Sequence, residues 1–269
     1  MNIARQHYQK ALARQAAEAA EGALSSPSVA EGTARADGMG GVIRPDAATN
    51  EAALMLVKLT SDRARLKAIQ SVERKVEAKR EMLPEYRAWV TGLLEASDSL
   101  PEGQPNDVLT SCMMWLIDAG DVDAALRIAE PVLARKIPLP SWFDRQPACA
   151  IAENIAEAAF AAIRSEAGFD PDHIAAVQLL TEGDDMPDEV RAKLHKAAAM
   201  LSERSIDVLL ESKVDDGPAG LLPALLDQAK VDAARALELH PGCGVKALIQ
   251  KLDRITKKIA AERVSPGTA

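Results

Sequence analysis

Lysine and arginine side chains are concentrated in one segment of an otherwise acidic chain. Between Lys58 and Arg80, eight basic residues stand against three acidic ones, which gives this segment a net charge of +5 in a chain whose net charge is −8. Such cations bind a phosphate backbone by displacing its condensed counterions. The chemistry that this segment offers is therefore phosphate binding, and a nucleic acid is the corresponding ligand.

A helical repeat of about 100° per residue separates the apolar and basic side chains of this segment. Leu66, Ile69, Val72 and Val76 fall on one face, which predicts that this face packs against the protein. The opposite face carries cations and an amide that could reach phosphates or base edges. The side chains that we predict to contact DNA are Arg63, Lys67, Gln70, Arg74, Lys75 and Lys79.

A solvated helix face is the alternative interpretation of the same residues. Lys58 with Asp62 and Arg74 with Glu77 have the spacing of ion pairs along one helix. Basic helices of this kind are common in proteins that do not bind nucleic acid, and only a clustered patch points to a nucleic acid. Taken alone, these residues leave both interpretations open.

The composition predicts an all-α fold. Hydrophobic residues make up 48% of the 269 residues, but only three Phe, three Trp and two Tyr are present, and the long segments rich in Ala, Leu, Glu, Lys and Arg lack the alternation of strands. Cys112, Cys149 and Cys243 are far apart and odd in number, which favours reduced thiols and a cytoplasmic location. No apolar run approaches the roughly 18 to 20 residues that span a bilayer, so we expect no membrane association.

Breaks in the helical pattern divide the chain into regions. Asn50 is expected to cap the basic helix, and Pro84 is expected to interrupt it before a second helix carrying Trp89. We predict helical hairpins together with one long basic helix. The regions are an N-terminal helix (1–21), a flexible linker (22–49), a basic helical region for DNA binding and oligomerisation (50–98), a helical-hairpin domain (105–263) and a disordered tail (264–269).

Two hairpins within the 105–263 domain resemble known motifs. Helices over 106–118 and 121–136, joined at Ala119 and Gly120, have the layout of a helix-turn-helix. The second helix begins with Asp121 and Asp123, which repel phosphate, so an interaction hairpin fits better. The segment ALELHPGCGVK in the last hairpin, 223–263, is similar to tetratricopeptide-type repeats.

Catalytic motifs are weak in this sequence. A metal-dependent nuclease needs converging carboxylates, for which Asp184, Asp185, Asp188 and Glu189 are the best local set, but their place beside Pro187 favours capping of a helix start. The four histidines lack the spacing of metal ligands, and the phosphate-binding loop of an ATPase is missing. We predict no metal site and no cofactor.

Several segments in series resemble the small terminase subunit, also called the terminase endonuclease subunit, of cohesive-end tailed phages. The likeness extends from about Leu54 to about Ile259 and has no catalytic motif. It is carried by LVKLTSDRARLKAIQSVERKVEAKREMLPEYRAWV (56–90), PNDVLTSCMMWLIDAGDVDAALRIA (105–129), the Ile137-Pro-Leu-Pro element, MPDEVRAKLHK (186–196) and GCGVKALIQKLDR (242–254).

The resemblance implies a phage DNA-packaging protein. Such a protein binds the packaging (cos) site on double-stranded DNA, recruits the large ATPase subunit, and forms a ring or other homo-oligomer. The family label also implies an endonuclease, for which this chain offers no identifiable motif. Two alternatives stay open: a metal-dependent endonuclease in its own right, and a helical adaptor that binds proteins and no DNA. The chain departs from the family pattern at its end, where ERVSPGTA replaces a long basic tail.

Overall fold

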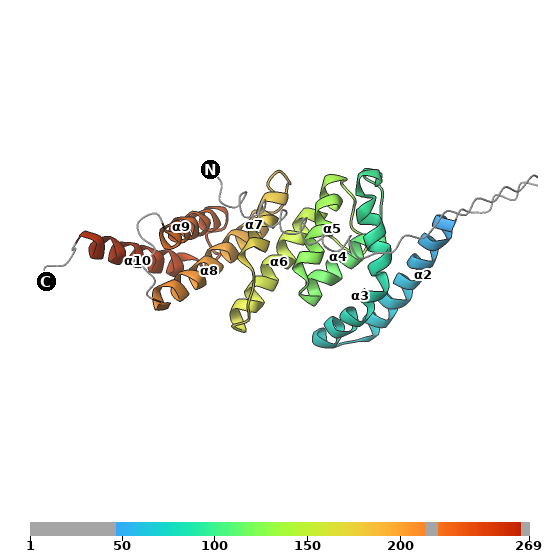
Figure 1. Ribbon diagram of the computed structural model, residues 1–269, viewed down its shortest axis with the longest axis horizontal. Coiled ribbons are helices and arrows are strands. Elements are labelled where there is room, and N and C mark those ends of the chain that lie inside the picture. The colour runs from blue at the N-terminus through green and yellow to red at the C-terminus, as the bar shows by residue number, and fades with distance from the viewer. Residues whose placement is uncertain (1–46, 213–219, 265–269) are drawn as a thin grey trace, which may run out of the picture.

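Helices form the whole of the regular structure in the part of the chain that the computed structural model describes, residues 47–212 and 220–264 (Figure 1). The predicted all-α class is confirmed. The predicted N-terminal helix, most of the linker and nearly all of the tail lie outside the described residues. The helices are α2 (Ala47–Ala68), α3 (Val72–Glu95), α4 (Asp107–Ala119), α5 (Val122–Ala134), α6 (Pro147–Arg164), α7 (Pro171–Leu180), α8 (Asp188–Ser212), α9 (Leu221–Leu239) and α10 (Lys246–Val264), with a 3-10 turn at Ser97–Ser99.

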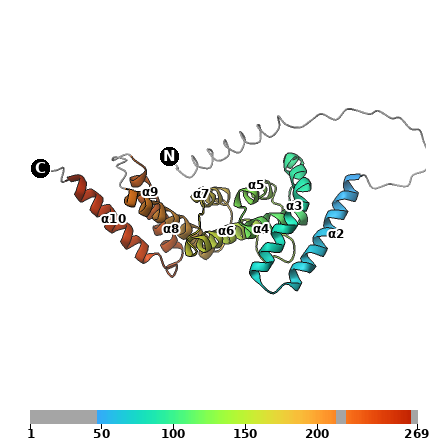
Figure 2. The same ribbon diagram turned by 60° about the horizontal axis from the view of Figure 1, so that its bottom comes forward.

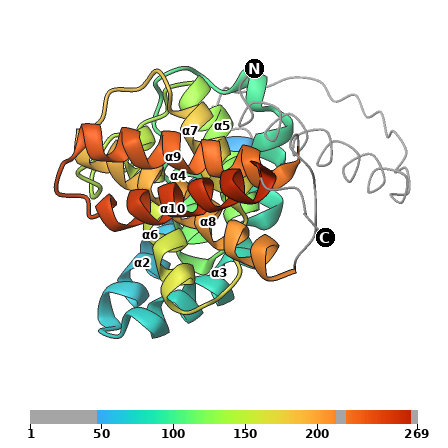
Figure 3. The same ribbon diagram turned by 90° about the vertical axis from the view of Figure 1, so that its left-hand side faces the viewer.

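The helices are arranged as antiparallel neighbours in an elongated row. Figure 1 places α2 and α3 at one end of the row and α10 at the other, and Figure 2 shows both terminal helices leaning outward from the middle. Viewed along the row, most of the helices overlie one another, and α2 and α3 extend to one side of them (Figure 3). Each helix contacts mainly those that are near it in the sequence. The row therefore leaves long stretches of helix surface open on its flanks.

The main core surrounds α4 and α6. On α4, Leu109 and Met113 are completely buried, and α3 packs against the same helix. On α6, the completely buried Ala152, Ala156 and Ala159 recur at helical spacing, and their small side chains let neighbouring helices approach closely. Because α3 shares this core, this part of the basic region packs directly against the hairpins that follow it.

A smaller core joins the last three helices. Ile206 of α8, Leu226 of α9 and Leu252 of α10 form its centre. Beside it, the buried Asp232 carboxylate of α9 lies 2.7 Å from His195 Nδ1 of α8 and accepts a hydrogen bond of 3.1 Å from Gln178 Nε2 of α7. These polar contacts connect the two cores. The similarity of this region to tetratricopeptide repeats is not confirmed.

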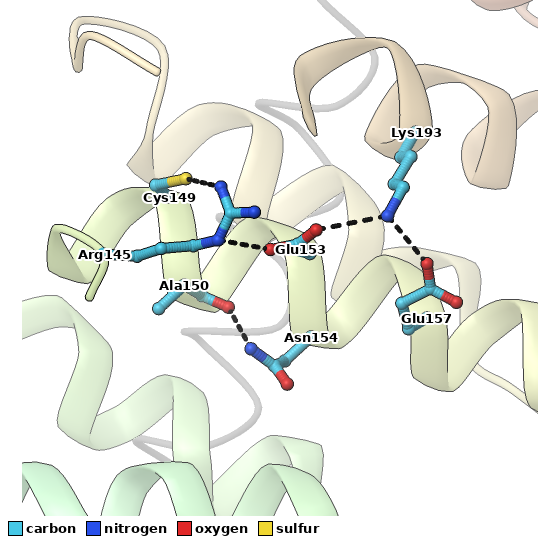
Figure 4. A network of polar contacts seen from close by, with 7 residues as sticks. All are labelled: Arg145, Cys149, Ala150, Glu153, Asn154, Glu157 and Lys193. Carbon is cyan, nitrogen blue, oxygen red and sulfur yellow. Dashed lines mark hydrogen bonds and ion pairs between the residues drawn. The ribbon is translucent and has the colours of Figure 1, made fainter. Parts of the chain in front are cut away.

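A second polar network fixes the loop between α5 and α6 (Figure 4). The Arg145 guanidinium pairs with Glu153 at 2.8 Å and donates a hydrogen bond to Cys149 Sγ at 3.5 Å. Lys193 of α8 bridges Glu153 and Glu157 of α6 at 3.1 and 2.9 Å. Both carboxylates raise the pKa of Lys193, Glu157 foremost, against the opposing effect of burial. The network ties α6 to α8 and reaches the main core at Cys149.

The predicted hairpin of α4 and α5 is confirmed. Asn106 and Asp121 cap the two helices by accepting hydrogen bonds from Leu109 N–H and Ala124 N–H, both at 3.1 Å. Gly120 ends α4 with φ at +86°, a conformation that residues with a Cβ rarely adopt. Since α4 is buried on most of its surface, this hairpin is part of the scaffold. Within the described residues, no helix is long and apolar enough to cross a membrane.

Candidate nucleic-acid interface

The basic segment forms two helices that meet at a sharp corner, where the sequence predicts one continuous helix up to Pro84. Helix α2 ends at Ala68 and α3 begins at Val72. The Ser71 side chain caps α3 by accepting a hydrogen bond from the Arg74 N–H at 3.3 Å. The predicted cap at Asn50 is wrong, because α2 already begins at Ala47.

Pro84 lies inside α3 and does not interrupt it, which corrects the predicted break. A proline removes one backbone hydrogen bond and clashes with the preceding turn. Met82 and Tyr86, on either side of it, are each only 1% exposed, so their burial outweighs this cost. The predicted apolar stripe is also interrupted at the corner, because Val72 is 76% exposed while Leu66 is buried.

Several cations of the segment are engaged within the protein. Lys58 pairs with Asp62 and Glu85 at 3.0 and 2.8 Å, which confirms the predicted Lys58–Asp62 pair. Arg65 pairs with Glu81 of α3 at 2.8 Å. The predicted pair of Arg74 with Glu77 does not form. The cations engaged farther along are Lys79, which pairs with Asp118 of α4, and Arg80, which donates to the Ala119 carbonyl at 2.9 and 3.1 Å.

A buried polar contact joins the two helices that form the corner. Tyr86 of α3 donates a hydrogen bond of 2.7 Å to Asp62 of α2, and Lys58 lies 5.0 Å from the centre of the Tyr86 ring. Burial raises the pKa of the Tyr86 hydroxyl, and the Asp62 carboxylate raises it further. Burial opposes the charge on Lys58, but its hydrogen bonds to Glu85 and Asp62 outweigh this effect and raise its pKa. These contacts and the buried Leu59 set the angle between α2 and the body of the protein.

Four of the six side chains predicted to contact DNA gather at the corner. Lys67, Gln70 and Arg74 are exposed and Lys75 is half-buried, and none has an ion-pair or side-chain hydrogen-bond partner among the described residues. The two other predicted residues are engaged: Lys79 in its ion pair, and Arg63 by stacking at 3.2 Å over the Trp142 ring. The corner thus presents cations and an amide to solvent at the tip of two helices.

The N-terminus of α3 adds to this electrostatic arrangement. Unpaired backbone N–H groups at a helix start carry a partial positive charge that favours a nearby anion. Arg74 and Lys75 lie in the first turn of α3, and Lys67 lies in the last turn of α2. Glu73 occupies the same first turn and reduces the local positive charge. The arrangement suits a ligand with spaced anionic groups, such as a phosphate backbone.

A second exposed row of polar and basic side chains, absent from the prediction, runs along α10. Lys246, Gln250, Arg254 and Lys257 are exposed and recur at helical spacing, opposite the side that carries Leu252. Lys251 is not part of this row, because it pairs with Glu203 and Asp207 of α8. The helical periodicity of KALIQKLDRITKK could have revealed the row from the sequence.

The acidic cluster considered as a metal site forms the approach to α8. Asp188 and Glu189 lie in the first turn of this helix, where carboxylates interact favourably with the helix dipole. The Asp184 backbone carbonyl accepts a hydrogen bond of 2.6 Å from Arg191. In the part of the chain that the structure describes, no group of three or more His, Cys, Asp or Glu side chains lies close enough together to hold a metal ion.

Comparisons with known proteins show the family to which this chain belongs. The family model described as phage small terminase subunit matches residues 56–189, from α2 to the start of α8. The terminase endonuclease subunit of Escherichia phage P2 is 37% identical over 203 residues, which cover 76% of this chain and 73% of that protein. The chain belongs to the phage small terminase subunit family. The predicted resemblance is thereby confirmed, and this family has a role in phage DNA packaging. No solved structure matches this terminase subunit significantly.

Proposed function

We propose that this small terminase subunit binds the packaging (cos) site of the phage genome through the α2–α3 corner and recruits the large ATPase subunit to it. The observation that carries the proposal is the contrast among the cations of the basic segment. Lys58, Arg65 and Lys79 are used to hold helices together, whereas Lys67 and Arg74 have no partner among the described residues. Side chains without an intramolecular role, gathered at one tip, are free to meet phosphates.

The corner also has a shape that suits a duplex. Two helix ends project from the row of hairpins, so a rod of DNA can approach without meeting the acidic body. Gln70 lies at the apex, where an amide could bond to a base edge or a phosphate. Arg63 and Lys79 flank the corner, and we expect a smaller contribution from them because each already has a partner.

The number of free cations sets the expected salt dependence. If Lys67, Arg74 and Lys75 each neutralise one phosphate, the slope of log K against log salt concentration is about −3 for each subunit that touches DNA. An oligomer that engages several subunits has a proportionally steeper slope. This slope distinguishes a phosphate-binding face from a protein-interaction face.

We also propose that the protein assembles into a ring-like homo-oligomer and that α2 contributes to the contact between copies. Leu54 and Val57 lie on one face of α2 and are 67% and 68% exposed, with Leu56 beside them. Large apolar side chains grouped on an exposed helix favour burial against a partner. Because the same helix leads into the corner, assembly would place the corners of neighbouring copies along one DNA molecule. Val57→Glu should lower the mass of the assembly in light scattering, and an unchanged mass would exclude this face.

Charge reversal at the corner tests DNA binding. Lys67→Glu with Arg74→Glu should weaken binding to a cos-site duplex at low salt by at least about tenfold, because two attractive contacts become repulsive. The matched control is Arg87→Glu with Arg127→Glu, which alters the net charge equally, at exposed positions on α3 and α5. If the corner variant binds as tightly as the wild type, the corner is not the DNA-binding surface. An equal loss in both variants would indicate an effect of overall charge alone.

A further inference from the structure

A groove between α3 and α5, away from the corner, has the build of a peptide-binding site. Two hollows of about 500 and 560 Å³ lie along these helices, and they share Leu94 and Arg127, so they form one continuous groove. Figure 1 shows α3, α4 and α5 as neighbours, and α4 packs against both of the other helices. Hollows of this size are typical of sites that bury a ligand.

The floor of the groove is apolar and incompletely covered. Leu83, Val90 and Leu94 of α3 and Leu116 of α4 are only partly buried, although they pack against the main core. From Leu83 to Leu94 the floor extends about 16 Å, which is three turns of helix. A helix that lies in such a groove inserts apolar side chains at positions i, i+3 or i+4, and i+7. The length and the apolar floor therefore suit a short amphipathic helix.

Along the first hollow, the rim of the groove carries arginines that have no ion-pair partner among the described residues. Arg87 on α3 and Arg127 on α5 are exposed, and neither has a hydrogen-bond or ion-pair partner among the described residues. Arg80, at one end, donates to the Ala119 carbonyl. Asp121 is the acid that lines the first hollow, and it already accepts a hydrogen bond as the cap of α5. The second hollow has no excess of positive charge, because it is lined by Asp98, Glu102 and Glu130 beside Arg127 and Arg135. The rim of the first hollow, where the floor from Leu83 to Leu94 lies, therefore favours a ligand whose apolar face is bordered by carboxylates.

We infer that this groove binds an acidic amphipathic helix of the large terminase subunit. The inference rests on the proposed recruitment of that subunit and gives it a location. Duplex DNA does not fit these features, because its phosphates could pair with the rim but would leave the apolar floor uncovered. The groove and the corner are built from different faces, so the subunit can hold DNA and the large subunit together.

The test measures binding of the purified large subunit of the same phage to the full-length chain by interferometry, with DNA binding measured in parallel. Arg87→Glu with Arg127→Glu reverses the rim, and Thr91→Trp fills the groove from an exposed position on its wall without altering the core. Each groove variant should lose about tenfold or more in affinity for the large subunit while retaining cos-site binding. Lys67→Glu with Arg74→Glu should do the reverse.

The other outcomes distinguish a failure of the groove from a failure of the corner. If both groove variants bind the large subunit as the wild type does, another surface makes the contact. If the wild type binds the cos site and not the large subunit, recruitment fails and DNA binding stands. If the wild type binds the large subunit and the groove variants lose it, but DNA binding is absent throughout, the groove stands and the proposed function of the corner falls.

Discussion

The hydrogen bond from Tyr86 to Asp62 should control how firmly α2 is attached to the protein. Tyr86→Phe removes this 2.7 Å bond and keeps the ring, which packs edge-on against Trp115 at 5.9 Å between centroids. A hydrogen bond to a charged group contributes about 1.5 to 3 kcal/mol. Since the Asp62 side chain keeps Lys58 as a partner and is 14% exposed, the cost should lie at the lower limit, about 1.5 kcal/mol.

Hydrogen exchange followed by mass spectrometry measures this cost where it arises. A free-energy loss of about 1.4 kcal/mol corresponds to a tenfold change in an opening equilibrium. Peptides of α2 in the Tyr86→Phe variant should therefore exchange about tenfold faster, whereas those of α6 and α8 should not change. Thr60→Ala is the control, because Thr60 bonds only to the Leu56 carbonyl within α2. Unchanged exchange in α2, or equal acceleration in α8, would refute the attachment of α2 through Tyr86.

Three further predictions concern pH, thiols and cutting. Burial raises the pKa of Tyr86 and raises that of Cys112 to about 12. The folded state therefore holds protons that the unfolded chain releases above roughly pH 8.5 to 10, so stability is full below this window and falls as pH rises through it. Urea midpoints should decrease between pH 8 and pH 10.5, and a constant midpoint would contradict this. At pH 8, iodoacetamide should label the partly exposed Cys243 before the buried Cys112 and Cys149, as peptide masses would report; equal labelling would exclude the buried core around α4 and α6. With Mg²⁺, the purified subunit should leave cos-site DNA uncut until the large subunit is added, and cutting by the subunit alone on a gel would favour a nuclease instead.

The helix pattern was predictable where local signals and packing agree. The start of α7 follows from local signals, because Asp170 caps the helix and Pro171 begins it. The turn at Gly120 was equally clear. The corner was missed because Ser71 is a weak signal within a basic periodic run, while Pro84 is a strong one that core packing overrides. Rules based on neighbouring residues in the sequence do not take into account that Met82 and Tyr86 are buried in the folded protein.

The residues of the candidate site could be predicted from the sequence. Which of its cations have partners within the protein, and which do not, could not be predicted. The sequence shows Lys58 and Asp62 as neighbours on a helix, and that pair is present. The partners of Arg65 and Lys79 lie 16 and 39 residues away, so only the packing of α2, α3 and α4 reveals them. Likewise, the groove between α3 and α5 depends on the angle at which two distant helices meet.

The measurement that tests the central claim most directly is binding of the purified protein to a cos-site duplex and to a scrambled duplex of equal length over a series of salt concentrations, with mass determined in parallel. We predict preferential binding of the cos-site duplex by an oligomer, with a slope of log K against log salt of about −3 or steeper. Charge reversal of Lys67 and Arg74 should reduce that slope by about two per engaged subunit. No binding to either duplex at low salt would contradict the account and favour an adaptor that contacts proteins alone.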